Sequence, residues 1–237
     1  MAIKLAKTAG FCMGVKRAVD IVLDIAQKNS NRKIYTYGPL IHNPQTIDLL
    51  KRRGVFPIER IDDIDPSGGT ILIIRAHGIS PEERTRIRDR GVTIVDATCP
   101  KVAHVQSIIK KHATRDYTTV IVGDREHPEV NGLLGYAGER GVVLSRESEV
   151  ENLPDTDRLC VVAQTTQNMD EYNRIVAGIR KRFPAAVIFN TICDSTERRQ
   201  SEVKELAKRA DAMIIIGGKN SANTRRLAGL SEQEGKP

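Results

Sequence analysis

The stretch "VDATCPKVAHV" (residues 95–105) indicates how the chain folds. Its β-branched start predicts a strand, and Pro100 suits the first turn of a helix, where the missing N–H costs nothing. We therefore expect Cys99 at the joint between the end of a strand and the start of a helix. A thiol in such a place can be an ordinary buried side chain or a metal ligand.

The pattern around Cys99 occurs three times in the chain. Each of three cysteines is followed by a helical stripe of apolar residues and then, roughly 25 residues later, by a predicted strand that ends in glycine. The cysteines are Cys12, Cys99 and Cys193, and the strands are IYTYG (34–38), TVIVG (119–123) and MIIIG (213–217). The sequence therefore contains an internal repeat.

The repeated unit alternates helices and strands over about 90 residues, which predicts an α/β fold with parallel sheets. We expect three units related by pseudo-threefold symmetry around one centre where the cysteines meet. The predicted parts are an N-terminal strand with the first cysteine (1–13) and three α/β units (14–98, 99–192 and 193–237). A full third unit would extend past Pro237, so it is expected to be incomplete, either as a half-unit or as a truncated piece.

Composition narrows the class of protein. Hydrophobic residues make up 40% and charged residues 28%, which is typical of a globular protein, and no apolar run is long enough to span a membrane. With no signal peptide either, a cytoplasmic location without disulfides is expected. The net charge of +7 is spread over short basic pieces, which is typical of solvated helix faces; an anionic substrate, an acidic protein partner and nucleic acid are the functional alternatives. Nucleic acid is the weakest candidate, because Trp is absent and aromatic residues are few.

The three repeated cysteines are candidates for metal ligands, since helix N-termini favour the thiolate form. No CxxC pair is present, so a local zinc ribbon has no support. Two choices stay open: a structural zinc site, which needs a fourth ligand, or an iron–sulfur cluster, which three thiolates can hold while one iron stays free for substrate. The fourth cysteine, Cys160, lies inside the apolar run LCVVA and is expected in the core.

Polar residues follow the predicted strands. His42, His77 and His127 each come after a strand beside glycine or proline, and Thr165 and Ser221 occupy corresponding loops. Imidazole, amide and hydroxyl groups suit the oxygens of a phosphate. Glu129 follows His-Pro in one of these loops, where burial would raise its pKa and let it deliver protons.

Eight motifs give the chain a resemblance to a known family. They are GFCMGVKRAV, IHNP, RAHG, DATCP, HPEVNG, QTT, TICDST and GGKNSAN, and they span nearly the whole chain. The chain resembles the LytB family, the 4-hydroxy-3-methylbut-2-enyl diphosphate reductases that act last in the non-mevalonate isoprenoid pathway. The resemblance implies reductive removal of the substrate's hydroxyl group to give isopentenyl and dimethylallyl diphosphate.

The resemblance also implies roles for individual residues. It implies a 4Fe–4S cluster on Cys12, Cys99 and Cys193, and places Thr165 and Glu129 near the substrate's hydroxyl group, with Glu129 relaying protons. The implied diphosphate site consists of His42, His77, His127, Thr165, Ser221, Ala222 and Asn223. Ala222 stands where the family often has a second serine, so only its main chain could bind. Reduced ferredoxin or flavodoxin is the implied electron donor.

Two further interpretations stay open at this point. The chain could be a fragment of such a reductase that binds the cluster but turns over poorly, because the family's last serine-bearing loop has no counterpart in it. Alternatively, it could be a non-catalytic metal protein that binds RNA through its basic surface, which would make its retention on RNA steeply dependent on salt.

Overall fold

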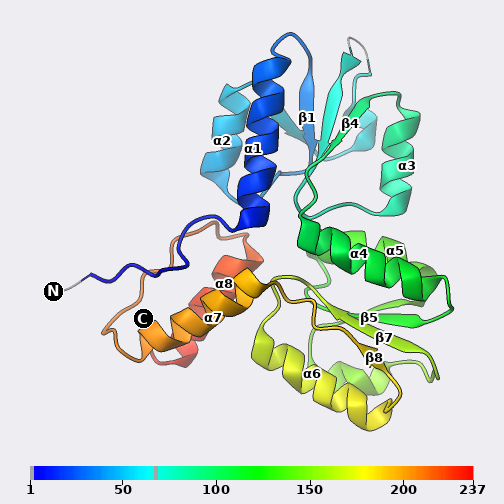
Figure 1. Ribbon diagram of the computed structural model, residues 1–237, viewed down its shortest axis with the longest axis vertical. Coiled ribbons are helices and arrows are strands. Elements are labelled where there is room, and N and C mark those ends of the chain that lie inside the picture. The colour runs from blue at the N-terminus through cyan, green and yellow to red at the C-terminus, as the bar shows by residue number, and fades with distance from the viewer. Residues whose placement is uncertain (1–2, 67–68, 237) are drawn as a thin grey trace.

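The first unit is a four-stranded parallel sheet with helices on both faces. The computed structural model describes residues 3–66 and 69–236 (Figure 1). The strand order is β2-β1-β3-β4. The elements are α1 (Met13–Lys28), β1 (Ile34–Tyr37), α2 (Pro44–Arg52), β2 (Val55–Ile58), η1 (Ile61–Asp63), β3 (Ile71–Ile74), α3 (Pro81–Asp89) and β4 (Thr93–Asp96).

Strand β3 shows why this sheet needs cover on both faces. Its sequence ILII is buried throughout, and side chains alternate between the two faces of a sheet. Ile71 and Ile73 pack with α1 and α2, whereas Leu72 and Ile74 pack with α3 and η1. A continuous apolar run is typical of a parallel strand between two helical layers.

The second unit repeats this plan. Its strand order, β6-β5-β7-β8, matches that of the first sheet position by position, and all pairs are parallel. The elements are α4 (Pro100–Ala113), β5 (Thr118–Val122), α5 (Pro128–Ala137), η3 (Gly138–Arg140), β6 (Gly141–Leu144), η4 (Glu147–Asn152), β7 (Leu159–Ala163), α6 (Met169–Arg182) and β8 (Val187–Ile188).

The two sheets confirm the predicted α/β class and the repeat within residues 14–192. Cys160 is fully buried on β7 among residues of α4 and α5, as expected for a core thiol. Ser80 precedes α3 and forms a capping box with Glu83: its Oγ accepts from the Glu83 N–H, and the Glu83 carboxylate accepts from the Ser80 N–H. The exact unit boundaries stay predictions.

The third region differs from the other two. It contains two packed helices, α7 (Asp194–Ala207) and α8 (Ala222–Gln233). The strand expected at residues 213–217 is absent from both described sheets, and Ile214 and Ile216 are 86% and 92% exposed. The prediction of a strand was wrong because a strand needs a hydrogen-bonded neighbour for its N–H and C=O groups, and no described strand pairs with this segment.

The N-terminal strand expected within residues 1–13 is also not found in the described residues 3–12. This segment instead lies along α7, where side chains satisfy its backbone. Glu202 accepts from the N–H groups of Lys7 and Thr8, and Arg199 donates to the carbonyl oxygens of Thr8 and Gly10. Residues 1–2 lie outside the described part of the chain.

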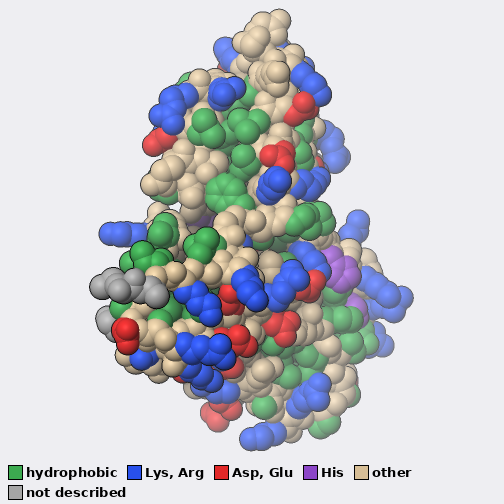
Figure 2. Space-filling view, turned by 60° about the vertical axis from the view of Figure 1, so that its left-hand side comes forward, with side chains coloured by type: hydrophobic (Ala, Val, Ile, Leu, Met, Phe, Trp, Pro, Cys, Tyr) green, Lys and Arg blue, Asp and Glu red, His purple; other side chains and the backbone are tan. Residues whose placement is uncertain are grey.

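Among the described helices, none is both long enough and apolar enough to cross a membrane. Lys and Arg side chains are spread over the face seen in Figure 2 and interspersed with acidic ones.

Candidate functional site

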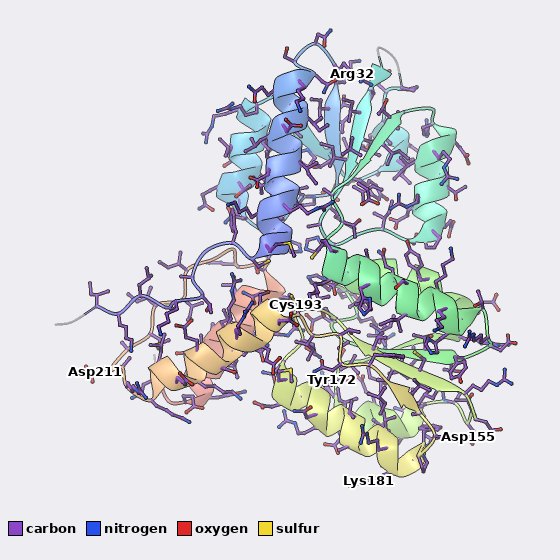
Figure 3. All side chains as sticks on the ribbon, viewed as in Figure 1. Arg32, Asp155, Tyr172, Lys181, Cys193 and Asp211 are labelled. Carbon is purple, nitrogen blue, oxygen red and sulfur yellow. The ribbon has the colours of Figure 1, made fainter. Side chains whose placement is uncertain are left out.

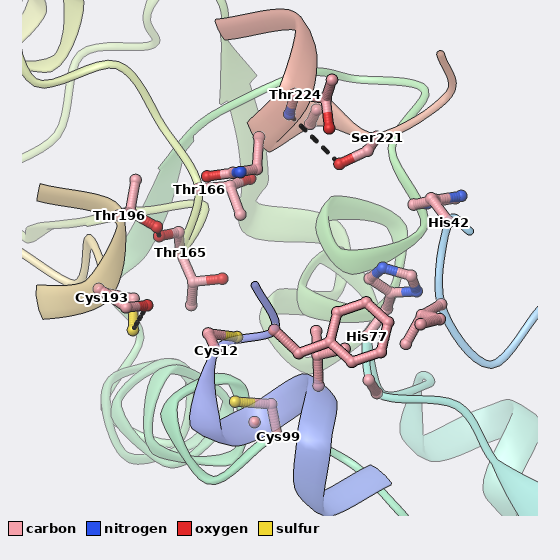
Figure 4. A pocket seen from close by; sticks show the side chains of 18 of the residues that line it. Cys12, His42, His77, Cys99, Thr165, Thr166, Cys193, Thr196, Ser221 and Thr224 are labelled. Carbon is pink, nitrogen blue, oxygen red and sulfur yellow. Dashed lines mark hydrogen bonds between the residues drawn. The ribbon is translucent and has the colours of Figure 1, made fainter. Parts of the chain in front are cut away.

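The three repeated cysteines occupy equivalent places in the structure. Cys12, Cys99 and Cys193 directly precede α1, α4 and α7 as their N-cap residues, and none of them caps its helix through the side chain. All three line one cavity of about 290 Å³ (Figure 4). Figure 3 shows Cys193 near the middle of the molecule, where the units meet. Cys12 and Cys193 are 181 positions apart in the sequence, yet both line the same cavity as Cys99, so the predicted convergence of the three cysteines is confirmed. Each of them precedes a helix, but no strand of the described residues precedes Cys12.

Close packing accompanies this convergence. A Cβ atom at Gly14 would overlap the sulfur of Cys99, so the first turn of α1 approaches Cys99 only because residue 14 lacks a side chain. Burial raises the pKa of the Cys99 thiol, and the neighbouring sulfurs of Cys12 and Cys193 add to that rise. All four cysteines are free thiols.

Three histidines from three strand-end loops form a second group in the cavity. The ring centroids of His42 and His77 are 4.6 Å apart, and that of His127 lies 5.5 Å and 5.3 Å from them. Burial lowers the pKa of all three, most strongly for His77, and brings the pKa of His127 to about 4. The rings are therefore neutral near pH 7 in the free protein.

Two ring nitrogens of this cluster have no hydrogen-bond partner among the described residues. His42 Nε2 and His77 Nδ1 are buried without a hydrogen bond to any described residue. His127 Nδ1 accepts from the Glu129 N–H at 3.1 Å, so in the neutral ring the proton lies on Nε2, which is a donor. Buried polar atoms without partners are costly, and a ligand rich in oxygen would satisfy them.

Glu129 and Thr165 form a buried pair beside the cysteines. One carboxylate oxygen of Glu129 accepts from the Thr165 N–H at 2.6 Å, and the other accepts from the Thr165 hydroxyl at 2.8 Å. Glu129 is 2% exposed, and burial raises its pKa while the two bonds from Thr165 act against that rise. The Thr165 carbonyl accepts from the Cys193 N–H at 2.9 Å, which ties the pair to the start of α7.

The start of α8 forms another wall of the cavity. Ser221, Ala222 and Asn223 all line it. Ser221 is the N-cap residue, and its Oγ accepts from the Thr224 N–H at 3.3 Å, which leaves the hydroxyl proton free to donate. The N-terminus of a helix favours a negatively charged ligand.

The cavity thus contains every residue that the sequence singled out, together with several that it did not. Thr166, Ser195, Thr196 and Arg199 also line the cavity. Thr196 donates to the Thr165 carbonyl at 3.0 Å. The position of Thr196, three residues after Cys193, could have identified it from the sequence as a residue of the site. Arg199 could not have been identified, because it resembles the other basic residues of a charged helix. His104 is exposed and His112 packs against Tyr117 and Phe189, away from the cavity.

Comparisons with known proteins agree with the resemblance. The family model described as "LytB protein" matches residues 3–237. A protein of Pelobacter propionicus is 44% identical over 228 residues, which cover 96% of this chain and 80% of that protein. One of Clostridium perfringens (strain SM101) is 41% identical over 230 residues, covering 97% and 80%. Both are named 4-hydroxy-3-methylbut-2-enyl diphosphate reductase.

The chain belongs to the LytB family. It spans only 35% of the length of a relative with the same name from Clostridium acetobutylicum, which is 41% identical over 226 residues. The family's named members are oxidoreductases, and the family binds an iron–sulfur cluster.

Solved structures agree as well. The Plasmodium falciparum E-1-hydroxy-2-methyl-but-2-enyl-4-diphosphate reductase superposes with a TM-score of 0.92 at 30% identity, covering 96% of this chain and 72% of that one. A second structure is titled as the diphosphate reductase that is the terminal enzyme of the non-mevalonate pathway. It has a TM-score of 0.76 at 42% identity and covers 98% and 82%.

Proposed function

We propose that this chain reduces 4-hydroxy-3-methylbut-2-enyl diphosphate to isopentenyl diphosphate and dimethylallyl diphosphate, using a 4Fe–4S cluster held by Cys12, Cys99 and Cys193. The observation that carries the proposal is the composition of one cavity. It combines three unpaired thiols, three neutral imidazoles and a buried carboxyl group that is bonded to a threonine.

The spacing of the sulfur atoms favours a cluster over zinc. With Zn–S bonds of about 2.3 Å, two sulfurs on one zinc ion lie within about 4.6 Å of each other. Among the described residues, only His42, His77 and His127 place three ligand atoms within 4.8 Å of one another. The three cysteines are therefore too far apart for one ion, whereas a cluster of several irons is larger and takes thiolate ligands. Once bound, the cluster would supply electrons to the substrate.

The histidine group suits a diphosphate better than a metal ion. A metal ion needs a ring nitrogen with a free lone pair, but His127 uses its lone pair on Nδ1 to accept from the Glu129 N–H. Its Nε2–H can donate to a phosphate oxygen, as can the Ser221 hydroxyl and the Asn223 amide. Main-chain N–H groups at the start of α8, including that of Ala222, provide further donors. Thr165 would bind the hydroxyl end of the substrate.

The buried pair of Glu129 and Thr165 suits proton delivery. The overall reaction breaks one C–O bond, forms one C–H bond and consumes two electrons and two protons, with one proton leaving in water. A carboxyl group with a raised pKa stays protonated closer to neutral pH and can act as a general acid. The Thr165 hydroxyl, which is bonded to Glu129, can pass a proton between this carboxyl group and the substrate's hydroxyl oxygen.

The electrons must come from outside the chain. Ferredoxin or flavodoxin is the proposed donor, because both are acidic proteins and this chain has a net charge of +7. A cytoplasmic location is part of the same proposal.

Anaerobic turnover tests the proposal. Cluster-loaded protein is mixed with reduced methyl viologen and the hydroxymethylbutenyl diphosphate, and the products are identified by mass spectrometry. We expect rapid viologen oxidation that depends on the substrate, with both isopentenyl and dimethylallyl diphosphate as products. A protein that carries a full complement of iron but does not oxidise the viologen would contradict the proposal and indicate a cluster-binding fragment instead.

A further inference from the structure

Helix α8 carries part of the proposed diphosphate site at its start, and a single arginine ties this helix to the second unit. Arg226 lies within α8 and its side chain is only 12% exposed. Within the described residues, it is the only side chain of α8 that forms hydrogen bonds with the second unit. Its two terminal nitrogens reach four oxygens there: Gln167 Oε1 at 2.6 Å, Asp124 Oδ1 at 3.0 Å, Thr166 Oγ1 at 3.3 Å and Gln164 Oε1 at 3.4 Å.

These four oxygens come from two different loops of the site. Asp124 follows β5 and lies in the loop that leads to His127 and Glu129. The other three follow β7 and flank Thr165. The loops also bond to each other, because the Asp124 N–H donates to Gln164 Oε1 at 2.9 Å. The Arg226 guanidinium therefore joins both loops that carry the Glu129–Thr165 pair.

An arginine suits this place for a geometric reason. The planar guanidinium has five donors in a fixed arrangement and can meet several oxygens at once, whereas a lysine presents one compact charge. Ser221 lies five residues before Arg226, about one and a half helical turns away. A helix is stiff over that distance, so the place of Arg226 fixes the place of the start of α8.

We propose that Arg226 is a positioning residue, which holds the diphosphate-binding start of α8 at the correct distance from the Glu129–Thr165 pair. This inference rests on the proposed function and names a residue outside the motifs that indicated it. Arg226 does not line the cavity itself and acts through the elements that it joins. Its positive charge also acts against the rise that burial causes in the pKa of Glu129.

The test measures the affinity of cluster-loaded protein for inorganic pyrophosphate by calorimetry, together with kcat and KM. We expect Arg226→Gln to weaken pyrophosphate binding by about tenfold to a hundredfold, the size of effect that a misplaced binding group produces, and to raise KM more than it lowers kcat. Arg226→Lys should recover little of this affinity. Full recovery with lysine would overturn the proposal, because a point charge would then be sufficient. Wild-type affinity in Arg226→Gln would also overturn it.

Asp124→Asn separates positioning from simple charge effects. This variant removes a negative charge near the proposed anion site, so an effect of charge alone would tighten pyrophosphate binding. Positioning predicts weaker binding, because Asp124 holds Arg226 in place. Tighter or unchanged binding in Asp124→Asn would overturn the proposal, and this variant provides the test even if Arg226→Gln fails to fold.

Arg182→Gln is the matched control. Arg182 is another partly buried arginine that joins two elements, since it donates to the Val150 and Glu151 carbonyls and to Asp155, which lies at the outer edge of the second unit (Figure 3). Its loss should lower the unfolding temperature without changing pyrophosphate affinity. If wild-type protein binds pyrophosphate but shows no turnover, the proposed function is wrong. The ratio of the pyrophosphate affinities of wild-type protein and Arg226→Gln still tests the role of Arg226 in that case. Failure of wild-type protein to bind pyrophosphate would overturn both.

Discussion

The first two units and the third region reach the same cavity by different means. Each of the first two units is built on four parallel strands whose apolar side chains are buried on both faces. The third region has two helices, and polar groups attach it around the cavity: the Cys193 N–H, Thr196, Gln200 and Arg226 all bond to the loop after β7. The third region also buries apolar side chains, such as Val203 and Leu230, between its own helices, but directional bonds position it against the sheets.

This difference suggests that the sheets and the third region contribute different parts of the site. The two sheets supply rigid strand ends that carry His42, His77, His127 and the Glu129–Thr165 pair. The third region supplies one thiol, the start of α8 and the bonds that fix both of them against the sheets. Substitutions at residues that line the cavity should therefore lower activity, whereas substitutions in the apolar cores of the two sheets should lower the free energy of unfolding.

The largest effect is expected at the third region's cysteine. Cys193→Ala removes one of three proposed cluster ligands, so the protein should lose most of its iron and all of its turnover. Iron and sulfide analysis of anaerobically loaded protein, together with viologen oxidation, measures this. Cys160→Ala is the control, because this thiol is buried in the core of the second unit and should leave the iron content unchanged. Full iron content in Cys193→Ala would exclude this residue as a ligand.

The next effect is expected at the buried carboxyl group. Glu129→Gln keeps the shape and the bond from the Thr165 N–H but removes the transferable proton, so kcat should fall by about 10²–10⁴-fold. The iron content should match that of wild-type protein. Glu126→Gln changes an exposed glutamate in the same loop and should keep full activity. A Glu129→Gln variant with full turnover would remove the proposed proton path.

The free energy of unfolding should depend more on apolar side chains of the sheets than on those of residues 213–217. Ile121→Ala deletes a fully buried side chain between β5 and its helices, and should lower the free energy of unfolding by about 2–5 kcal/mol. Ile216→Ala changes a side chain that is 92% exposed and should alter it by no more than about 0.5 kcal/mol. Denaturant titration measures both. A loss at Ile216 as large as that at Ile121 would show that residues 213–217 are packed in solution.

The smallest effect is a proton taken up when the diphosphate site fills. Burial lowers the pKa of His42 in the free protein, and its Nε2 has no partner among the described residues, so nearby phosphate oxygens would raise this pKa by favouring the cation. Pyrophosphate binding near pH 6 should therefore be accompanied by proton uptake at His42, which calorimetry in buffers of different ionisation enthalpy detects. Comparison with His42→Gln separates this uptake from the titration of pyrophosphate itself. His42→Gln should take up fewer protons than wild-type protein, and an equal uptake in both would exclude His42 as the group that titrates.

Much of the fold followed from the sequence, for identifiable reasons. Buried parallel strands leave continuous apolar runs such as ILII and LCVVA, and proline after cysteine marks the start of α4. The repeated spacing from cysteine to glycine then related the units. The run MIIIG carries the same local signal as the paired strands, but pairing depends on a neighbour that local sequence does not reveal.

Many of the residues that line the cavity were predictable from the sequence, but the residue that positions α8 was not. The cysteines, histidines and Glu129 were found because each follows a strand or starts a helix, and such positions converge in parallel α/β folds. Arg226 was not found, because one of two consecutive arginines within a helix gives no sign of burial. Its importance depends on Asp124 and Gln167, which lie far away in the sequence and come together only through the fold.

The central claim is that the proposed cluster and the diphosphate share one cavity built from three segments. Electron paramagnetic resonance of the reduced, cluster-loaded Glu129→Gln variant, whose slow turnover preserves the bound substrate, tests this claim most directly. Adding one equivalent of the hydroxymethylbutenyl diphosphate should change the spectrum of the cluster, because the substrate's hydroxyl end would lie beside the sulfur ligands. A spectrum that does not change while calorimetry shows a saturated site would contradict the account.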